Sequence, residues 1–487
     1  MPAADDTMPP TRTSTPREPQ NEEATPTAKH NERLFTSAEQ NRPERAFLAA
    51  VEATGEESLW NADDSLSELA SLARTAGAEV LGTMVQRLRS PDQTTYLGKG
   101  RANELAQLRR ELDFDLVMVD DELSPSQQRN LEEIVEARVI DRTALILDIF
   151  AQHAHTREGQ LQVELAQLQY RLPRLVGRGR EMTRIGGGSR GSGGGGVGGA
   201  IGVRGPGETK LEIDRRRIRT RIAELRRELE AIREHRGQRR RQRASKAIPV
   251  VAIVGYTNAG KSTLFNKLTD AGVLAENKLF ATLDPTTRHV VLPSHGEVLM
   301  TDTVGFIQKL PTSLVAAFRA TLEEVIEADI LLEVVDITHE NAIEQSETVN
   351  DVLAELGAAD KPRVTALNKI DLLADPQQID RALFPNAVPV SALTGEGIGD
   401  LLEMVGEVIA EGMVPVRLRI PFDRGELTEI FHRRGHVVEE RQEADGVYLR
   451  GGLPAALLGM FAPFRLGSFP ERARRPRTRD LATADAE

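Results

Sequence analysis

The sequence of 487 residues has no cysteine, one tryptophan and an aromatic content of 4%. The lack of cysteine excludes disulfide bonds and metal sites built on thiolates, and it fits a reducing cytoplasm. No run of about 18 apolar residues occurs, so the sequence predicts no membrane span. The N-terminus, Met1-Pro2-Ala3-Ala4-Asp5-Asp6, has no basic segment followed by an apolar one, so we expect no signal peptide and a cytoplasmic location.

Acidic residues outnumber basic ones, 74 Asp and Glu against 62 Lys and Arg, so the formal net charge is −12. The whole chain is therefore not a general polyanion binder, and any surface for nucleic acid must be local. Residues 1–40 are rich in Pro, Thr, Glu and Asn and poor in apolar residues, which predicts a disordered tail. Residues 471–487, with several arginines, are predicted to be a second disordered tail. We expect both tails to be solvated segments.

A phosphate-binding pattern, G-x-x-x-x-G-K-[ST], stands between an apolar run at 248–254 and a helical pattern that begins at Thr263. In this context, free backbone N–H groups and the positive end of the helix dipole face the phosphates. Lys261 is predicted to reach the β- and γ-phosphates, and the Ser262 hydroxyl to ligate Mg²⁺. The predicted loop consists of Gly255, Tyr256, Thr257, Asn258, Ala259, Gly260, Lys261 and Ser262.

A second pattern, N-K-x-D, follows a probable strand about a hundred residues later. Its carboxylate, Asp371, can accept hydrogen bonds from the N1 and N2 donors of guanine, which adenine does not present. The segment 391–393 completes this base pocket by its position after the next strand. The predicted base-binding residues are Asn368, Lys369, Ile370, Asp371, Ser391, Ala392 and Leu393.

Between these patterns lies a D-x-x-G sequence, Asp302, Thr303, Val304 and Gly305. Asp302 would hold Mg²⁺ through water, and the Gly305 N–H would sense the γ-phosphate. Thr282 is the candidate for a second Mg²⁺ hydroxyl, in a loop where an order–disorder switch would occur; Thr286 and Thr287 compete with it for this role. The predicted loop is Phe280, Ala281, Thr282, Leu283 and Asp284.

Taken in order, these five motifs resemble those of the translation-factor class of small GTPases. The segments Gly205–Arg217 and Phe280–Arg288 resemble signatures of the HflX family, and the resemblance covers roughly residues 65–470. It implies a Mg²⁺-dependent enzyme that binds GTP and GDP, hydrolyses GTP, binds the large ribosomal subunit and its RNA, and splits stalled or idle ribosomes. Phe306 stands where signalling GTPases carry a water-positioning glutamine, so no catalytic residue is assigned and slow intrinsic turnover is expected.

Upstream of the phosphate loop, residues 65–150 alternate strand and helix patterns, which predicts a small α/β subdomain with a parallel sheet. Within it, Tyr96-Leu97-Gly98-Lys99-Gly100 resembles a family motif. This motif would hold a phosphate group of RNA or of a second nucleotide, and a glycine turn that starts a helix explains it equally well.

Residues 151–246 predict a basic antiparallel helical hairpin, made of one long helix over 141–175 and a second over about 208–245. Its tip, residues 186–207, has 13 glycines among 22 residues. From Arg204 to Lys246 there are 16 Lys and Arg against 7 Asp and Glu, which gives a local net charge of +9. Such a surface suits phosphate contacts with folded RNA, although a charge run is more often a solvated helix face.

The predicted fold class is α/β. A P-loop GTPase domain at 248–412, a doubly wound sheet with nucleotide at the carboxyl ends of its strands, follows the small α/β domain and its helical hairpin, and precedes a small α+β module at 414–470. Two other functions remain open. One is a nucleotide-gated scaffold for ribosome assembly or hibernation, in which GTP binding does the work. The other, a tRNA-modification GTPase, is disfavoured because no Cys lies near the C-terminus and the glycine-tipped hairpin has no role in it.

Overall fold

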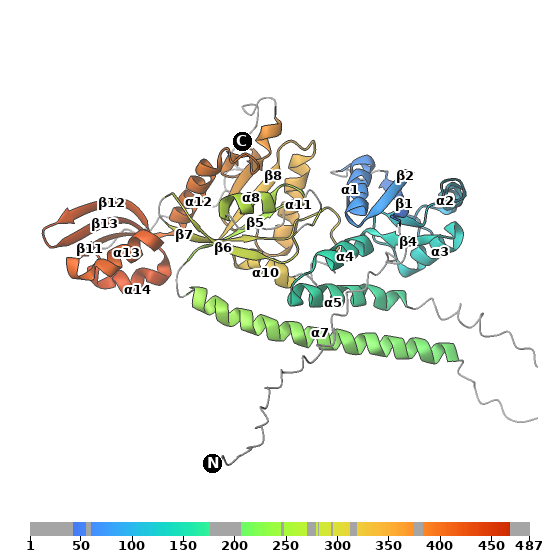
Figure 1. The fold of residues 1–487 in the computed structure, drawn as a ribbon, viewed down its shortest axis with the longest axis horizontal. Helices are drawn as coiled ribbons and strands as arrows, with labels where there is room; N and C mark the ends of the chain where they lie inside the picture. The colour runs from blue at the N-terminus through green and yellow to red at the C-terminus, as the bar shows by residue number, and fades with distance from the viewer. Residues whose placement is uncertain are drawn as a thin grey trace, which may run out of the picture.

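A computed structural model describes residues 42–54, 60–175, 206–244, 248–269, 279–280, 282–293, 296–311, 319–373 and 383–467. The predicted tails, the glycine-rich segment 186–205 and Ala281 lie outside the described residues. The described elements form an N-terminal unit (44–153), a helical hairpin (157–244), a central unit (250–412) and a C-terminal unit (414–464). Figure 1 shows the three units in a row, with the hairpin along one side of the central and N-terminal units.

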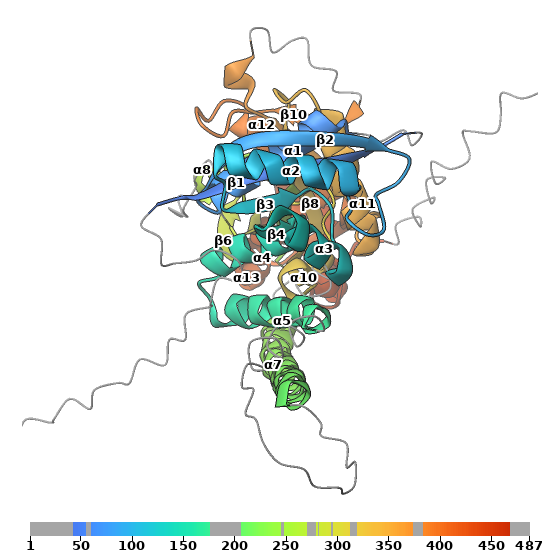
Figure 2. The ribbon, with the colours of Figure 1, turned by 90° about the vertical axis from the view of Figure 1, so that its right-hand side faces the viewer.

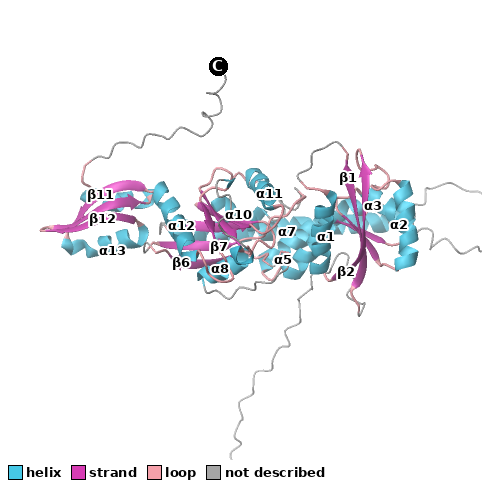
Figure 3. Cartoon of the chain, turned by 90° about the horizontal axis from the view of Figure 1, so that it is seen from above, coloured by secondary structure: helices cyan, strands magenta, loops and turns pink. Residues whose placement is uncertain are grey.

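The N-terminal unit is a four-stranded parallel sheet in the order β2-β1-β3-β4 with helices on its faces. Mostly buried apolar runs make β1, β3 and β4, whereas the edge strand β2 is mainly half-buried or exposed; all four residues of β3 are buried, for example. Figure 3 shows this sheet edge-on beside the central unit. The elements in chain order are β1 (Glu44–Ala53), α1 (Ala62–Thr75), β2 (Ala78–Leu88), α2 (Lys99–Leu112), β3 (Leu116–Val119), α3 (Pro125–Val135), β4 (Arg138–Asp141) and α4 (Arg142–His153).

Two sequence-based expectations for this region were wrong. The predicted subdomain began at residue 65, which leaves out β1, a strand that pairs with both β2 and β3 inside the sheet. The predicted long helix over 141–175 is two helices, because the chain turns at Ala154–Thr156 and Thr156 caps a new helix by accepting a hydrogen bond from the Gly159 N–H at 3.0 Å.

The helical hairpin consists of α5 (Arg157–Arg174) and α7 (Pro206–Ala244). The two helices run antiparallel, since Arg157 pairs with Glu228 at 2.8 Å and Glu164, further along α5, pairs with Arg221 at 2.8 Å. Figure 2 shows the pair below the two sheets. An apolar seam between the helices holds them together, and each fully buried leucine in it contributes about 1.5–3 kcal/mol. The seam contains Leu161, Leu165, Ile222, Leu225 and Leu229.

The central unit is a six-stranded sheet in the order β10-β9-β8-β5-β7-β6, in which β6 alone is antiparallel to its neighbour. Helices cover both faces, as predicted for a doubly wound fold. The elements are β5 (Val250–Gly255), α8 (Lys261–Thr269), β6 (Thr286–Val291), β7 (Glu297–Asp302), α10 (Arg319–Glu327), β8 (Ile330–Asp336), α11 (Ala342–Glu355), β9 (Arg363–Asn368), β10 (Ala387–Pro389) and α12 (Ile398–Gly412).

The C-terminal unit is a three-stranded antiparallel sheet in the order β11-β13-β12 with α13 against one face. It has its own apolar core, which includes Leu418, Phe431 and Leu449. None of the helices that the structure describes combines the length and the apolar composition needed to cross a membrane. The elements are β11 (Val414–Ile420), α13 (Gly425–Arg434), β12 (His436–Glu443), β13 (Gly446–Leu453) and α14 (Leu458–Phe461).

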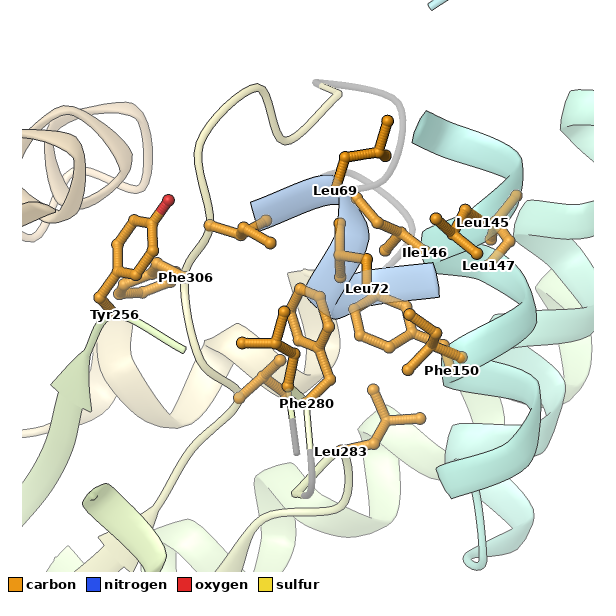
Figure 4. Packing of buried hydrophobic residues seen from close by; sticks show 14 of the residues in the cluster. Leu69, Leu72, Leu145, Ile146, Leu147, Phe150, Tyr256, Phe280, Leu283 and Phe306 are labelled. Carbon is orange, nitrogen blue, oxygen red and sulfur yellow. The ribbon is translucent and has the colours of Figure 1, made fainter. Parts of the chain in front are cut away.

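One hydrophobic core joins the N-terminal and central units. It runs from Leu69 and Leu72 of α1 and Phe150 of α4 to Phe280 and Phe306 of the central unit. Figure 4 shows Phe280 and Leu283 against Phe150, whose ring meets that of Phe280 edge-on at 4.7 Å between centroids. Because neither unit encloses this core alone, the two units form one packed body.

Candidate functional site

The predicted phosphate loop lies at the carboxyl end of β5 and leads into α8. Two glycines are required by close approach: a Cβ on Gly255 would lie 2.3 Å from the Val334 carbonyl oxygen, and one on Gly260 would lie 2.2 Å from Asn368 Nδ2. Lys261 crosses the loop, and its Nζ donates a hydrogen bond to the Tyr256 carbonyl at 2.7 Å. Burial lowers the pKa of Lys261 to about 8, although nearby Asp302 acts to raise it.

Three oxygen-bearing side chains from separate elements meet beside this loop. Ser262 Oγ lies 2.7 Å from Thr282 Oγ1, and both hydroxyls donate to Asp302 Oδ2, at 2.7 and 3.1 Å respectively. Asp302 is fully buried, and burial raises its pKa against the hydrogen bond from Ser262. We call these residues the hydroxyl–carboxylate cluster.

The hydroxyl–carboxylate cluster suits a magnesium ion. Asp302 Oδ1 is buried and has no hydrogen-bond partner among the described residues, so an acceptor is available for a metal-bound water. In the part of the chain that the structure describes, no group of three or more His, Cys, Asp or Glu side chains is placed to hold a metal. Mg²⁺ with few protein ligands, completed by phosphate and water oxygens, fits such a donor set.

The structure separates Thr282 from the two competing threonines. Thr286 and Thr287 lie in β6, paired with Asp302 and Thr301 of β7. The Thr287 hydroxyl lies 2.9 Å from the Thr301 hydroxyl, away from Ser262. Thr282 is therefore the threonine that reaches the hydroxyl–carboxylate cluster.

The side chains around Thr282 do not share its site. Phe280 and Leu283 are buried in the core that joins the two units. Asp284 accepts hydrogen bonds at the start of α5, from the backbone N–H of His155 at 2.9 Å and of Thr156 at 2.7 Å. Their predicted place at the nucleotide rested on sequence proximity, and their side chains bind the neighbouring elements instead.

The D-x-x-G segment packs directly against the phosphate loop. A Cβ on Gly305 would lie 2.9 Å from the Thr257 Cα and 2.8 Å from Lys261 Nζ, so the backbone of the phosphate loop leaves room only for glycine here. Thr303 is buried and donates to the Ile253 carbonyl at 2.6 Å, and Val304 is buried in the joint core. Phe306 is 1% exposed, and its backbone pairs with the phosphate loop through the Thr257 N–H at 2.8 Å. Its ring is a core side chain and has no means of orienting water.

The predicted base pocket is braced to the phosphate loop. Asn368 Nδ2 donates to the Ala259 carbonyl at 2.8 Å, and Asn368 Oδ1 accepts from the Ala392 N–H at 2.9 Å. Ser391 Oγ donates to Asp371 Oδ1 at 2.6 Å, which orients that carboxylate. The structure thus brings the two distant motifs together at the carboxyl ends of β9 and β10.

Three further base-pocket residues have different surroundings. Lys369 Nζ pairs with Asp336 at the end of β8, at 2.5 Å. Ile370 is buried, and its N–H donates to the Val390 carbonyl at 3.3 Å. Leu393 is 75% exposed, so its side chain adds no packing inside the pocket.

Sequence reasoning missed the contact between the phosphate loop and the N-terminal unit. The Tyr256 hydroxyl donates to Glu68 of α1 and accepts from the Gln308 N–H at 2.9 Å. The Tyr256 ring stacks on the Trp60 ring, with 5.9 Å between their centroids. A cavity of about 540 Å³ opens here between α1 and the phosphate loop, lined in part by Trp60, Asn258 and His339. The phosphate loop therefore faces a second folded unit, and a partner 188 residues away leaves no local signal.

The motif at Tyr96–Gly100 is a turn that begins α2. Tyr96 and Leu97 are buried in the core on the other face of the N-terminal sheet, and Gly98 precedes α2 with a positive φ of 82°. The Tyr96 hydroxyl donates to Asp121 and accepts from the Val51 N–H at 3.1 Å. The structure thus shows a helix-starting turn at this motif.

Together, the glycine-bounded phosphate loop, the hydroxyl–carboxylate cluster and the braced N-K-x-D motif define the class, a P-loop GTPase. Protein-family models agree along the chain: "GTP-binding GTPase N-terminal" matches residues 63–151, "GTP-binding GTPase Middle Region" matches 153–243, and "50S ribosome-binding GTPase" matches 250–369.

Proteins of a known family are similar in sequence to this chain over most of its length. GTPase HflX of Caldanaerobacter subterraneus is 46% identical over 84% of this chain and 90% of its own length. GTPase HflX of Lacrimispora saccharolytica is 45% identical, over 86% and 96%, and that of Escherichia coli is 44% identical, over 79% and 88%. The chain belongs to the HflX GTPase family, and it hydrolyses GTP to GDP and phosphate.

Proposed function

We propose that this GTPase binds the large ribosomal subunit through its helical hairpin and dissociates stalled or idle ribosomes, and that the ribosome stimulates its GTP hydrolysis. The description of the family model that matches residues 250–369, a 50S ribosome-binding GTPase, supports the partner. Ribosome binding entails a cytoplasmic location, in line with the absence of cysteine.

The observation that carries the proposal is the outer face of α7. Ile222, Leu225 and Leu229 face α5, and at 3.6 residues per turn Arg216 and Arg227 lie on the opposite side of α7, with Arg219 and Arg226 on one flank. These arginines are exposed and form no ion pair among the described residues, unlike Arg221, which pairs with Glu164. We call them the arginine row: Arg216, Arg219, Arg226 and Arg227.

Arginines without ion-pair partners are well suited to phosphate binding. Arginines that already pair with carboxylates would have to break those ion pairs, whereas free guanidinium groups can form bidentate hydrogen bonds with phosphate oxygens. In the described part of the hairpin, Tyr170 is 7% exposed, so base stacking along a single strand is not favoured there. The surface therefore suits the backbone of folded RNA.

For the nucleotide, we assign roles to the residues that the structure brings together. Lys261 and the N–H groups of the phosphate loop would neutralise and hold the phosphates, and Asp371 would select guanine. Ser262 and Thr282 would hold Mg²⁺ directly and Asp302 through water, and the ion would neutralise charge that develops on the phosphate oxygens. Gly305 would offer its N–H to the γ-phosphate.

The chain supplies these binding and positioning groups but no side chain at position 306 that orients the attacking water. Slow intrinsic hydrolysis follows, and a partner that fixes Thr282 and the D-x-x-G segment at the phosphates would accelerate it. The alternative, a GTP-gated scaffold, would use the same binding site without needing hydrolysis for its action.

The first prediction concerns the arginine row. Changing Arg216, Arg219, Arg226 and Arg227 to Glu should strongly reduce nucleotide-dependent co-sedimentation with purified large subunits. The slope of log affinity against log salt should fall by up to about 3, because each lost phosphate contact removes roughly 0.7–0.9. GTP binding and basal hydrolysis should stay unchanged, since these residues are remote from the nucleotide site.

Glu230→Ala is the matched control, because Glu230 lies beside the arginine row and pairs with Arg233 at 3.5 Å. It should not weaken binding. Equal sedimentation of the charge-reversed variant and wild type would overturn the proposal. Equal splitting with a non-hydrolysable GTP analogue would instead favour the scaffold.

A further inference from the structure

The segment Thr282–Asp284 connects the nucleotide site to the hairpin over very few residues. Thr282 reaches the hydroxyl–carboxylate cluster, and Asp284, two positions later, reaches the start of α5. Two residues span at most about 7 Å of chain. Leu283 between them is 2% exposed and fixed in the joint core, so no slack is available to separate the two contacts.

The Asp284 carboxylate satisfies the backbone just before α5. One oxygen accepts from the N–H groups of His155 and Thr156, and the other accepts from the Thr156 hydroxyl. Thr156 in turn caps α5 through the Gly159 N–H. A negative charge at this end of a helix is also favoured by the helix dipole.

Gly159 makes room for this contact. A Cβ at that position would lie 2.5 Å from Asp284 Oδ1, well inside van der Waals contact. An alanine there could be accommodated only if the Asp284 carboxylate moved away. The junction is thus a fitted contact between two segments 128 residues apart.

α5 is held at its other end by the N-terminal unit. Arg174 pairs with Asp141 at 2.9 Å and donates to the Leu123 carbonyl at 2.6 Å. Along its length, α5 packs on α7 through the apolar seam. A displacement of Asp284 therefore shifts one end of a helix that is anchored at its other end. Because α5 packs on α7, such a shift also changes the position of the arginine row.

We propose that Asp284 is a positioning residue that couples the γ-phosphate state of the nucleotide site to the hairpin. When Thr282 is drawn to the metal and the γ-phosphate, Asp284 is held on α5; when Thr282 is released, the Asp284 contact loosens. By reciprocity, holding α5 favours the GTP-bound arrangement. This inference rests on the proposed role of Thr282 and is independent of ribosome binding.

Two variants break the contact from opposite sides. Asp284→Ala removes the carboxylate, and Gly159→Ala displaces it while leaving the central unit unchanged. Alanine also favours helix over glycine, so Gly159→Ala does not weaken α5 itself. Ser124→Ala is the matched control, because Ser124 caps α3 with a hydrogen bond of the same kind at 3.2 Å, far from residues 280–284.

The experiment measures hydrogen exchange and affinity in the full chain, with GDP and with a non-hydrolysable GTP analogue plus Mg²⁺. In wild type, the amides of residues 155–161 should exchange more slowly with the analogue than with GDP. Both variants should lose this difference, and the analogue-to-GDP affinity ratio should fall roughly 3- to 30-fold, the scale of a lost cap. GDP affinity should not change.

The control Ser124→Ala should keep both the exchange difference and the affinity ratio. If Asp284→Ala or Gly159→Ala keeps them too, the coupling is overturned. Thr282→Ala distinguishes the two levels: if it keeps the analogue-to-GDP ratio, the metal role of Thr282 fails, whereas loss of the ratio in Thr282→Ala alone would refute the coupling and leave that role intact.

Discussion

Lys261 is a buried lysine whose charge depends on whether phosphate is bound. Its pKa is lowered to about 8 by burial, and bound phosphates would raise it again. Below pH 8 the lysine is already charged before the nucleotide arrives. Above pH 8, binding must also take up a proton, so the affinity decreases as pH rises.

We therefore expect GDP affinity to be about tenfold lower at pH 9 than at pH 7, because one pH unit above the pKa leaves roughly one molecule in ten charged. Calorimetry in buffers of different ionisation enthalpy should show proton uptake on binding at pH 8.5, after correction for titration of the nucleotide itself. Equal affinity at both pH values would contradict this expectation.

Thr282 supports a second prediction on the scale of one hydroxyl. Thr282→Ala should leave GDP affinity nearly intact and weaken binding of a GTP analogue with Mg²⁺ by about tenfold or more, the value of a hydrogen bond to a charged group. Thr286→Ala and Thr287→Ala are matched controls, because both residues lie in β6. Loss in Thr286→Ala but not in Thr282→Ala would show that the assignment is wrong.

At the scale of elements, one buried arginine ties α4 to its neighbours. Arg142, which begins α4, is 1% exposed and pairs with Glu68 of α1 and with Asp120 after β3, the latter at 2.7 Å. Burial alone would raise the pKa of Asp120, but the charges of Arg142 and of Lys309 lower it. Lys309 follows the D-x-x-G segment, and its Nζ lies 2.5 Å from Asp120 Oδ2. The network therefore also holds the D-x-x-G segment to the N-terminal unit.

Arg142→Met should reduce the free energy of unfolding by about 3–5 kcal/mol, because it removes the buried cation that pairs with both Glu68 and Asp120. Urea denaturation at pH 7 measures this loss. The lowered pKa of Asp120 stabilises the fold fully above the ordinary value of 3.8, and this stabilisation is lost as pH falls from that value through the lowered pKa. The difference in unfolding free energy between wild type and Arg142→Met should therefore narrow over that pH range. Arg87→Ala is the control and should leave stability nearly unchanged, because the Arg87 side chain is 78% exposed where it pairs with Glu52.

Local sequence patterns predicted the helices and strands better than the tertiary contacts between them. The phosphate loop and the six strands of the central sheet were predictable because each depends on a short segment. The strand β1 was missed because its run Phe47-Leu48-Ala49-Ala50 is rich in helix formers, and its conformation depends on pairing with β2 and β3. The break between α4 and α5 had a signal in the capping residue Thr156, but the apolar pattern continues across it.

The same reasoning explains the site. Ser262, Thr282 and Asp302 were predicted from motif spacing and meet in space. The partners of Tyr256 and Asp284 were not predictable, because Glu68 and Thr156 lie 188 and 128 residues away in the chain. Contacts at such separations depend on how the units pack and not on any nearby sequence.

For the whole molecule, the shared core predicts how the units unfold. The N-terminal and central units should unfold together in one calorimetric transition, because Phe150, Phe280 and Phe306 belong to both. The C-terminal unit encloses its own core and should give a separate transition. A fragment that ends at residue 412 should keep its affinity for GDP, because it retains the N-terminal and central units. Separate calorimetric transitions for the N-terminal and central units would contradict their joint packing.

The joint core also sets an order of assembly during synthesis. The N-terminal unit leaves the ribosome first and can complete its parallel sheet from residues 44–141 alone. The central strands then emerge beside a preformed apolar face, onto which Phe280, Leu283 and Phe306 close. The nucleotide site is thus finished on a template, and a circular permutant that makes the N-terminal unit last would expose these three side chains for the whole time of its synthesis.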